Sequence, residues 1–291
     1  MPDVLNDLID RLRLERIESN HFRGQSQDLG WGAMFGGQVL GQALSAASQT
    51  VAPERLVHSL HAAFLRPGDV SAPVLYEVDR LRDGGSFSAR RVLAIQGGEP
   101  LFSLMASFMT PEEGFDHQTA PPDVPPPEAL KNERQLAIEL AERYPAARPM
   151  IKVASGPIEM RPVQPLNYLE PQPMPARRQI WYRTVGPLPD DPLTHRALLA
   201  YASDFNFLVT AMLPHGVTWV TPGMQVTSLD HAMWFHRPFR FDEWLLYDLE
   251  SPSAHGGRGV VRGRFYTRDG VLAASVVQEG LMRDRSRARR T

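Results

Sequence analysis

The chain has 291 residues, of which 43% are hydrophobic and 22% charged, and its net charge at pH 7 is -2. This composition is ordinary for a globular protein and excludes a chain that is mainly disordered. A charge so close to zero creates no global field that would draw the protein to nucleic acid or an anionic membrane, and we expect neither as a partner. The chain has no cysteine, which excludes disulfides, thiolate metal sites and cysteine nucleophiles.

The N-terminal residues predict a short amphipathic helix, because their apolar positions follow helical spacing. Acidic residues come early and no signal-peptide core follows, and no apolar run approaches the ~18–20 residues that cross a bilayer. We therefore expect a cytoplasmic protein without a membrane span. The basic tail 283–291 carries five arginines, for which a solvated chain end is favoured over a phosphate or RNA contact. The apolar positions of the N-terminal segment are Val4, Leu5, Leu8, Ile9 and Leu12.

Proline marks a division in the middle of the chain. Of 26 prolines, 17 lie between Pro111 and Pro192, and proline at this density opposes regular helix and sheet. Within this stretch only Glu128–Arg143 has a helical pattern. The composition therefore predicts an N-terminal repeat over residues 1–110, a proline-rich surface connector over 111–175 and a C-terminal repeat over 176–291.

The two halves contain matching segments in the same order. Val74–Val78 (Val-Leu-Tyr-Glu-Val) resembles Leu245–Leu249 (Leu-Leu-Tyr-Asp-Leu), and the two segments are 171 residues apart. Each follows an Arg-Pro pair, and the pairs Arg66-Pro67 and Arg237-Pro238 have the same separation. An ordered set of matches at a constant separation indicates an internal duplication.

Each half begins with a strand-like segment and an apolar helix and continues with β-rich runs, which predicts an α+β fold. The segments are strand 17–24 and helix 37–51 in the first half, then strand 179–185, helix 194–212 and runs 225–236, 243–250, 259–267 and 271–282. Asp269-Gly270 predicts a tight hairpin between the last two runs. The second helix is apolar nearly all round and should be buried. This pattern predicts a tandem, or double, hotdog: two antiparallel sheets, edge to edge, each wrapped round a central helix.

Several common sites are absent from the sequence. There is no Gly-x-Ser-x-Gly elbow, no Walker loop and no His-Glu-x-x-His motif, and Gly30-Trp-Gly-Ala-Met-Phe-Gly36 misses the dinucleotide fingerprint. The pairs His58 with His61 and His231 with His236 have no carboxylate at ligand spacing. We therefore expect neither a metal ion nor an organic cofactor.

Asp204 is the most informative residue, because it falls within the apolar helix of the second half. A buried carboxylate is costly without hydrogen-bond partners or a working role. A structural aspartate bonded to nearby backbone is the alternative, but the first helix, Met34 to Val51, has no acidic residue, which favours one asymmetric site. Ser228 and Gln278 interrupt apolar strands of the same half. A carboxylate, a hydroxyl and an amide that converge could hold and deprotonate one water molecule.

Five blocks of the sequence resemble the acyl-CoA thioesterase II family, a double-hotdog family, over nearly the whole chain. The blocks are Phe35-Gly-Gly-Gln-Val-Leu-Gly-Gln-Ala-Leu44, Val57-His-Ser-Leu-His-Ala-Ala-Phe-Leu-Arg-Pro-Gly-Asp69, Ala202-Ser-Asp-Phe-Asn-Phe-Leu208, Leu229-Asp-His-Ala-Met-Trp-Phe-His236 and Val277-Gln-Glu-Gly-Leu-Met-Arg283.

The resemblance implies hydrolysis of medium- to long-chain acyl-CoA to fatty acid and coenzyme A, without metal or cofactor, by a homo-oligomer such as a dimer of double hotdogs. It implies that Asp204, Ser228 and Gln278 activate the attacking water. The family pattern has threonine two residues before its Asp-His pair, where this chain has Ser228, preceded by Thr227. The resemblance also makes His58, Gly36 and Gly37 candidates for substrate contact, and leaves His58 as a rival base.

Two alternatives to hydrolysis stay open at this point. The pattern of hotdog hydratases has a histidine five residues after the aspartate. The fifth residue after Asp204 is Val209, which disfavours a hydratase. A non-catalytic acyl-CoA-binding protein is the other alternative.

Overall fold

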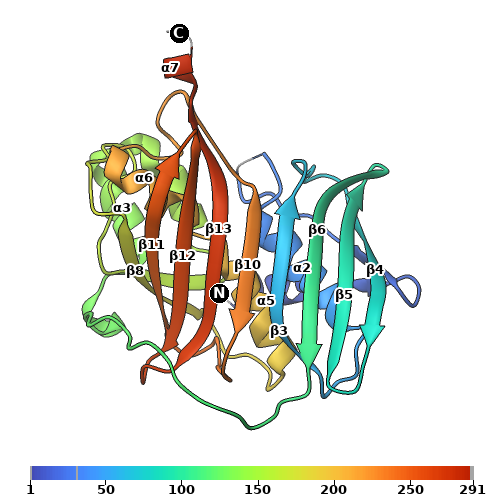
Figure 1. Ribbon diagram of the computed structural model, residues 1–291. Coiled ribbons are helices and arrows are strands. Elements are labelled where there is room, and N and C mark those ends of the chain that lie inside the picture. The colour runs from blue at the N-terminus through green and yellow to red at the C-terminus, as the bar shows by residue number, and fades with distance from the viewer. Residues whose placement is uncertain (1, 31, 289–291) are drawn as a thin grey trace.

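The computed structural model describes residues 2–30 and 32–288 and has an α+β architecture (Figure 1). The first half contains α1 (Pro2–Leu12), β1 (Glu15–Arg16), β2 (His21–Gly24), α2 (Gly36–Ser48), β3 (Leu56–Phe64), β4 (Val74–Asp83), β5 (Phe87–Gln96) and β6 (Glu99–Met109). The connector contains η1 (Pro127–Ala129), α3 (Glu133–Arg143), η2 (Pro145–Ala147), α4 (Arg148–Val153) and β7 (Ile158–Pro162). The second half contains β8 (Arg177–Thr184), α5 (Pro192–Ser203), α6 (Phe207–Met212), η3 (Leu213–His215), β9 (Met224–Ser228), β10 (Asp230–Phe235), β11 (Leu245–His255), β12 (Arg258–Thr267), β13 (Leu272–Asp284) and α7 (Arg285–Ala288).

The strands of the described residues form one continuous antiparallel sheet. Its order is β1-β2-β4-β5-β6-β3-β10-β13-β12-β11-β8-β7, and β9 pairs separately with β13. The two halves meet where β3 pairs with β10, with Asp230 opposite Ala63 and Trp234 opposite Ser59. The predicted double hotdog is confirmed, and its two sheets are joined edge to edge.

The internal duplication is visible in the strand order. Counted outward from the β3–β10 junction, β6, β5, β4 and β2 on one side correspond to β13, β12, β11 and β8 on the other. The matched segments Val74–Val78 and Leu245–Leu249 occupy β4 and β11, each the fourth strand of its half when β3 and β10 are counted as the first. Gly270 turns the hairpin between β12 and β13 at a φ of 88°, a conformation that costs glycine little.

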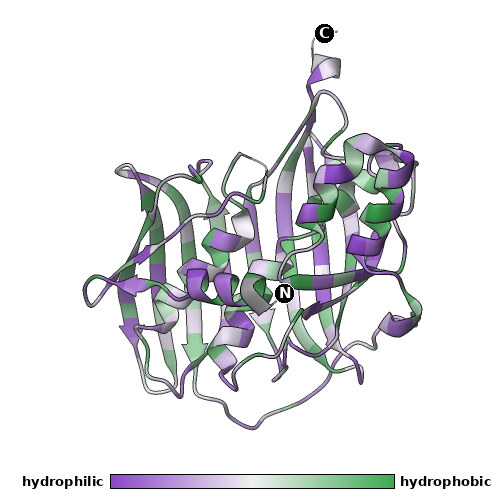
Figure 2. Cartoon of the chain, turned by 180° about the vertical axis from the view of Figure 1, so that it is seen from behind, coloured by the Kyte–Doolittle hydropathy of each residue, from purple (hydrophilic) through white to green (hydrophobic). Residues whose placement is uncertain are grey.

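The helices α2 and α5 lie side by side behind the sheet (Figure 1). Buried and less buried positions alternate along much of β4 and β5, the period of two that buries one face. Figure 2 shows hydrophobic and hydrophilic residues interspersed along the strands. On α2, small and apolar side chains let the helix lie buried along nearly its whole length. α1 packs on both helices through Leu5, Leu8, Ile9 and Leu12, whereas Val4 is exposed.

The second core helix differs from the prediction of one helix over 194–212. α5 ends at Ser203, Asp204 is its C-cap, and α6 begins at Phe207. Asn206 between them has a φ of 69°, a left-handed conformation that ends a helix and that asparagine tolerates better than most residues. Among the described residues, the stretch Pro192–His215 is long and apolar enough to cross a membrane by composition alone, yet 67% of its apolar window is buried in this protein.

The run predicted as one strand over 225–236 is also divided. β9 pairs with β13 with Ser228 opposite Gly280, whereas β10 pairs with β13 with Ala232 opposite Val277. One extra residue at Leu229 therefore forms a β-bulge. A regular strand over 225–236 would place Ser228 and Asp230 on one face, but with the bulge Asp230 is exposed and His231 is buried.

The connector carries more structure than its proline content predicts. Its helix is α3 (Glu133–Arg143), shorter than the expected 128–143, and α4 follows it. β7 pairs with β8 and extends the sheet at its edge. The boundaries at residues 110 and 175 stay predictions.

Candidate active site

Asp204 lies at the break between α5 and α6, where it is partly accessible from a cavity. Burial raises the pKa of Asp204 to about 6, and hydrogen bonds from the Gln278 amide, the Gly37 backbone N–H and the Ser228 hydroxyl oppose that rise. Burial penalises the charged form, whereas donors stabilise it. The carboxylate can therefore be ionised near neutral pH and still accept a proton readily.

The N-terminus of α2 faces the Asp204 carboxylate. The Gly37 N–H donates to it, and the unpaired amides of a helix N-terminus favour negative charge. A Cβ atom at Gly36 would lie 2.7 Å from Asp204 Oδ2 and 2.9 Å from the Phe64 ring. Glycine at position 36 therefore permits the carboxylate to approach the helix.

Ser228 and Gln278 lie next to Asp204. Ser228 Oγ is 3.5 Å from Asp204 Oδ1, and Gln278 Nε2 donates to Ser228 Oγ at 2.7 Å. Gln278 is buried on the inner face of β13, and Ser228 is half-buried at the end of β9. Thr227 is exposed. The structure thus brings together the three residues that the resemblance nominates and leaves Thr227 outside.

His231 belongs to the same network, and the sequence reasoning missed it. Its Nδ1 atom is 2.7 Å from Gln278 Oε1, and its Nε2 atom is 2.9 Å from Ser203 Oγ. Burial lowers the pKa of His231 to about 4, so the ring is neutral at pH 7. The available signal was its place beside Asp230 in a family block, but its inward direction depends on the bulge at Leu229.

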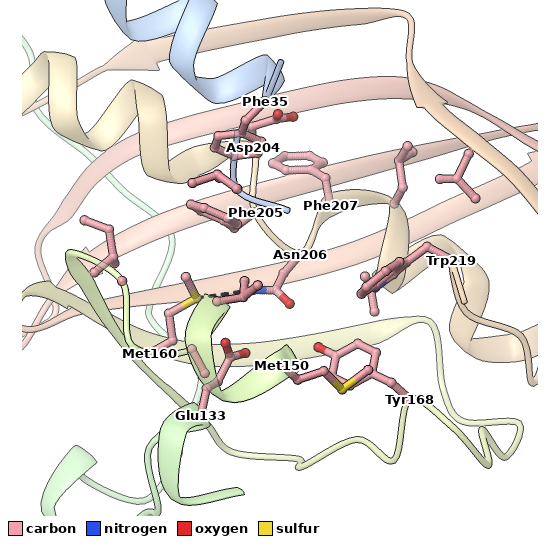
Figure 3. A pocket seen from close by; sticks show the side chains of 18 of the residues that line it. Phe35, Glu133, Met150, Met160, Tyr168, Asp204, Phe205, Asn206, Phe207 and Trp219 are labelled. Atoms are coloured by element: carbon pink, nitrogen blue, oxygen red, sulfur yellow. Dashed lines mark hydrogen bonds between the residues drawn. The ribbon is translucent and has the colours of Figure 1, made fainter. Parts of the chain in front are cut away.

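A cavity of about 1240 Å³ opens beside Asp204, Ser228 and Gln278. In Figure 3, Asp204 and Phe35 stand on one side and Glu133, Met150 and Tyr168 on the other. The connector supplies much of this far wall. Most of the lining is apolar, as in ligand pockets generally, and includes Leu136, Leu140, Met150, Met160, Leu166, Phe205, Phe207, Leu208 and Trp219.

A buried polar cluster in the cavity wall holds the helix break. Arg178 is 1% exposed, and its Nη1 atom donates to Asn206 Oδ1 at 2.5 Å. Asn206 Nδ2 donates to the Tyr182 hydroxyl at 2.7 Å. Glu133 of α3 lies 3.9 Å from Arg178. These contacts satisfy Asn206 in its left-handed conformation and connect α3 to the segment that carries Asp204.

His58 lies outside this group of residues. Its Nε2 atom is 2.8 Å from Ser107 Oγ, and its ring packs against Phe87. Both partners belong to the first half, on β6 and β5, and His58 does not line the cavity. The structure therefore gives His58 no contact with Asp204, whereas Gly36 and Gly37 adjoin it. Within residues 2–30 and 32–288, no cluster of three His, Asp or Glu side chains could hold a metal ion.

This arrangement can activate a water molecule. A carboxylate of raised pKa is a competent general base near neutral pH. A hydroxyl and an amide beside it can fix the position of the water molecule that gives up the proton. Ser228 faces a carboxylate and not a histidine, so the group lacks the serine–histidine pair that activates a nucleophilic serine. The geometry therefore favours attack by water over a serine-linked intermediate.

Two family models match the chain. A model described as acyl-CoA thioesterase matches residues 150–281, which include Asp204, Ser228 and Gln278. A model described as acyl-CoA thioesterase N-terminal domain matches residues 26–109.

Full-length relatives support the same assignment. Acyl-CoA thioesterase 2 of Haemophilus influenzae is 43% identical over 97% of this chain and 99% of its own length. Human acyl-coenzyme A thioesterase 8 is 44% identical over 94% of this chain and 87% of its own. The crystal structure of an acyl-CoA thioesterase II from Mycobacterium marinum is 44% identical, with a TM-score of 0.76 over 95% of this chain and 98% of that one. A hot dog fold protein from Alicyclobacillus acidocaldarius, 22% identical with a TM-score of 0.76, shows the shared fold alone.

Proposed function

Because the chain belongs to the acyl-CoA thioesterase family, we propose that it hydrolyses medium- to long-chain acyl-CoA thioesters with Asp204 as general base. One observation carries this proposal. The Asp204 carboxylate lies beside the hydrogen-bonded Ser228 and Gln278 at the wall of a large apolar cavity. The cavity would take the acyl chain and place its thioester beside the carboxylate.

The reaction needs one water and no cofactor. Asp204 takes a proton from the water while the water oxygen bonds to the thioester carbonyl carbon. Ser228 and Gln278 hold the water in line for this attack. The tetrahedral intermediate then collapses, the C–S bond breaks, and the thiolate of coenzyme A leaves and takes the proton. General-base assistance of this kind contributes ~10²–10⁴ in rate.

The size of the cavity supports a substrate with a long acyl chain. Its volume of about 1240 Å³ lies above the ~300–1,000 Å³ of ordinary small-molecule pockets. Burial of each methylene in such a cavity contributes about 0.8 kcal/mol, so longer chains should bind more tightly until the cavity is filled. Leu136 and Leu140 of α3 and Met150 of α4 line this cavity, and we expect these side chains to set that limit.

Release of free thiol from palmitoyl-CoA, followed with a thiol reagent, tests the proposed activity. We expect steady turnover by the purified protein after treatment with a chelator. Tight binding of palmitoyl-CoA without thiol release would instead indicate an acyl-CoA-binding protein. Activity that a chelator abolishes and zinc restores would contradict the metal-free mechanism.

The rate should depend on pH through Asp204. Burial raises the pKa of this carboxyl to about 6, and only the ionised form can accept the proton. We therefore expect kcat to be constant well above pH 6 and to fall about tenfold per pH unit well below it, provided that circular dichroism shows an intact fold. A kcat that stays flat from pH 8 to pH 4.5 would argue against Asp204 as the base.

A further inference from the structure

We propose that His231 is a positioning residue that fixes the side-chain amide of Gln278 so that its NH₂ group faces Ser228 and Asp204. The inference rests on the proposed function, because it assigns His231 to the water-activating group described above. His231 does not line the cavity, so it would act on the reaction only through Gln278.

The β-bulge at Leu229 places Gln278 between Ser228 and His231. On a regular strand, Ser228 and His231, which are three positions apart, would point to opposite faces of the sheet. With the bulge, both point inward, and Gln278 contacts Ser228 through Nε2 and His231 through Oε1. The bulge is held by Leu229, whose N–H donates to Glu279 and whose carbonyl accepts from Phe64. Bulges that redirect a side chain are common beside active sites.

The hydrogen bonds run in one direction toward Asp204. An amide oxygen is only an acceptor, so the 2.7 Å contact with Gln278 Oε1 requires that His231 Nδ1 carry the proton. Gln278 Nε2 then donates to Ser228 Oγ, and the Ser228 hydroxyl donates to Asp204 Oδ1. Every donor in this series of hydrogen bonds favours the ionised Asp204 carboxylate, which is the form that acts as base.

The opposite arrangement is chemically possible, which is why His231 matters. If the amide turned over, its NH₂ group would donate to His231 Nδ1, and its oxygen would accept from Ser228. His231 Nε2 would then carry the proton and donate to Ser203 Oγ, whose hydroxyl donates to the Ala200 carbonyl. With the proton on Nδ1, the Ser203 hydroxyl donates to His231 Nε2 in place of the Ala200 carbonyl. Asp204 would lose the donated bond from Ser228 and the amide of Gln278. The tautomer of His231 thus decides which end of Gln278 faces the carboxylate.

The surroundings leave His231 little freedom to move. His231 is 0% and Gln278 1% exposed, so bulk water cannot replace the bond between them. Phe207 packs edge-on against the His231 ring at 5.6 Å. The Tyr247 hydroxyl donates to the Ser203 carbonyl at 2.9 Å, which fixes the segment that carries the second partner of His231. The ring is held on both sides, as required of a residue that orients another.

A double-mutant cycle tests the coupling between His231 and Gln278. We expect His231→Phe to lower kcat roughly 10-fold to 100-fold, by analogy with residues that orient metal ligands in metalloenzymes, with little change in KM. His231→Asn, which keeps an N–H donor near the Nδ1 position, should recover part of that loss. In a Gln278→Ala background, His231→Phe should change kcat less than about twofold, because nothing remains to be oriented.

The matched control is His236→Phe. His236 is an exposed histidine of the same half, and it also bonds a serine hydroxyl, Ser275 Oγ, at 2.9 Å. It is outside the site, and its replacement should leave kcat unchanged. Thermal unfolding of each variant separates a loss of activity from a loss of fold.

Nitrogen NMR of the unmodified enzyme tests the tautomer directly and needs no variant to fold. We expect a neutral His231 protonated at Nδ1 at pH 7. A ring protonated at Nε2, or equal losses from His231→Phe with and without Gln278, would overturn the inference. A fully active Gln278→Ala variant would overturn the water-activation scheme itself, and this inference with it.

Discussion

Asp204→Asn should lower kcat for palmitoyl-CoA by roughly 10²–10⁴, because the amide cannot accept the proton of the attacking water. The replacement is nearly isosteric, and its oxygen can still accept the bond from the Gly37 N–H. In the proposed mode the acyl chain binds in the apolar cavity and not to this carboxylate, so KM should change little. The measurement is steady-state thiol release, compared with Asp190→Asn at an exposed site before α5.

The direction of the change in stability caused by Asp204→Asn can also be predicted. The pKa of Asp204 is about 6 in the folded protein and 3.8 as the unperturbed reference, so between these values the folded state binds the proton more tightly. At pH 7 both states are ionised, and the buried charge destabilises the fold. Asparagine removes that charge, and Tm at pH 7 should stay the same or rise. An unchanged kcat in a folded variant would refute the role of Asp204.

The fold could be predicted because its signals are repeated. Each half shows an apolar helix and a set of strands, and the matched segments now found in β4 and β11 indicated the duplication. Burial of α2 and α5 follows from small and apolar residues at most positions of both helices. Such patterns survive small errors in element boundaries, because they average over many residues.

The details that shape the site could not be read from pattern alone. The break after Ser203 depends on Asn206, whose left-handed conformation is held by Arg178 and Tyr182 from a distant strand. The bulge at Leu229 depends on bonds to Glu279 and Phe64 in two neighbouring strands. Both features arise from tertiary contacts, and both change the direction of the side chains that follow them.

The cavity wall illustrates the same limit. The proline-rich segment has a weak helical pattern, and nothing in that pattern indicates that α3 and α4 line the cavity beside Asp204. Their role depends on the pairing of β7 with β8 at the edge of the sheet. The sequence thus locates the connector but not what the connector encloses.

The two neighbouring hydroxyls of β9 should differ sharply in their effect on turnover. Ser228 Oγ accepts from Gln278 Nε2 at 2.7 Å and lies 3.5 Å from Asp204 Oδ1, whereas Thr227 is exposed. Ser228→Ala should lower kcat about 10²-fold, the scale for removal of one positioned hydrogen-bonding group. Thr227→Ala should leave kcat within about twofold and, as an exposed substitution, the free energy of unfolding within about 0.5 kcal/mol.

Ser228→Thr completes the comparison, because it keeps the hydroxyl and adds a β-branch. Threonine favours strand geometry, and the branch restricts the rotamer that points the hydroxyl at Asp204, so this variant should retain activity. It also recreates the residue that the family pattern places before the Asp-His pair. If Thr227→Ala were the inactive variant and Ser228→Ala the active one, the inward direction of Ser228 would be wrong. The pairing of β9 with β13, with Ser228 opposite Gly280, would then have to shift by one residue, and Gln278 would lose its partner on that strand.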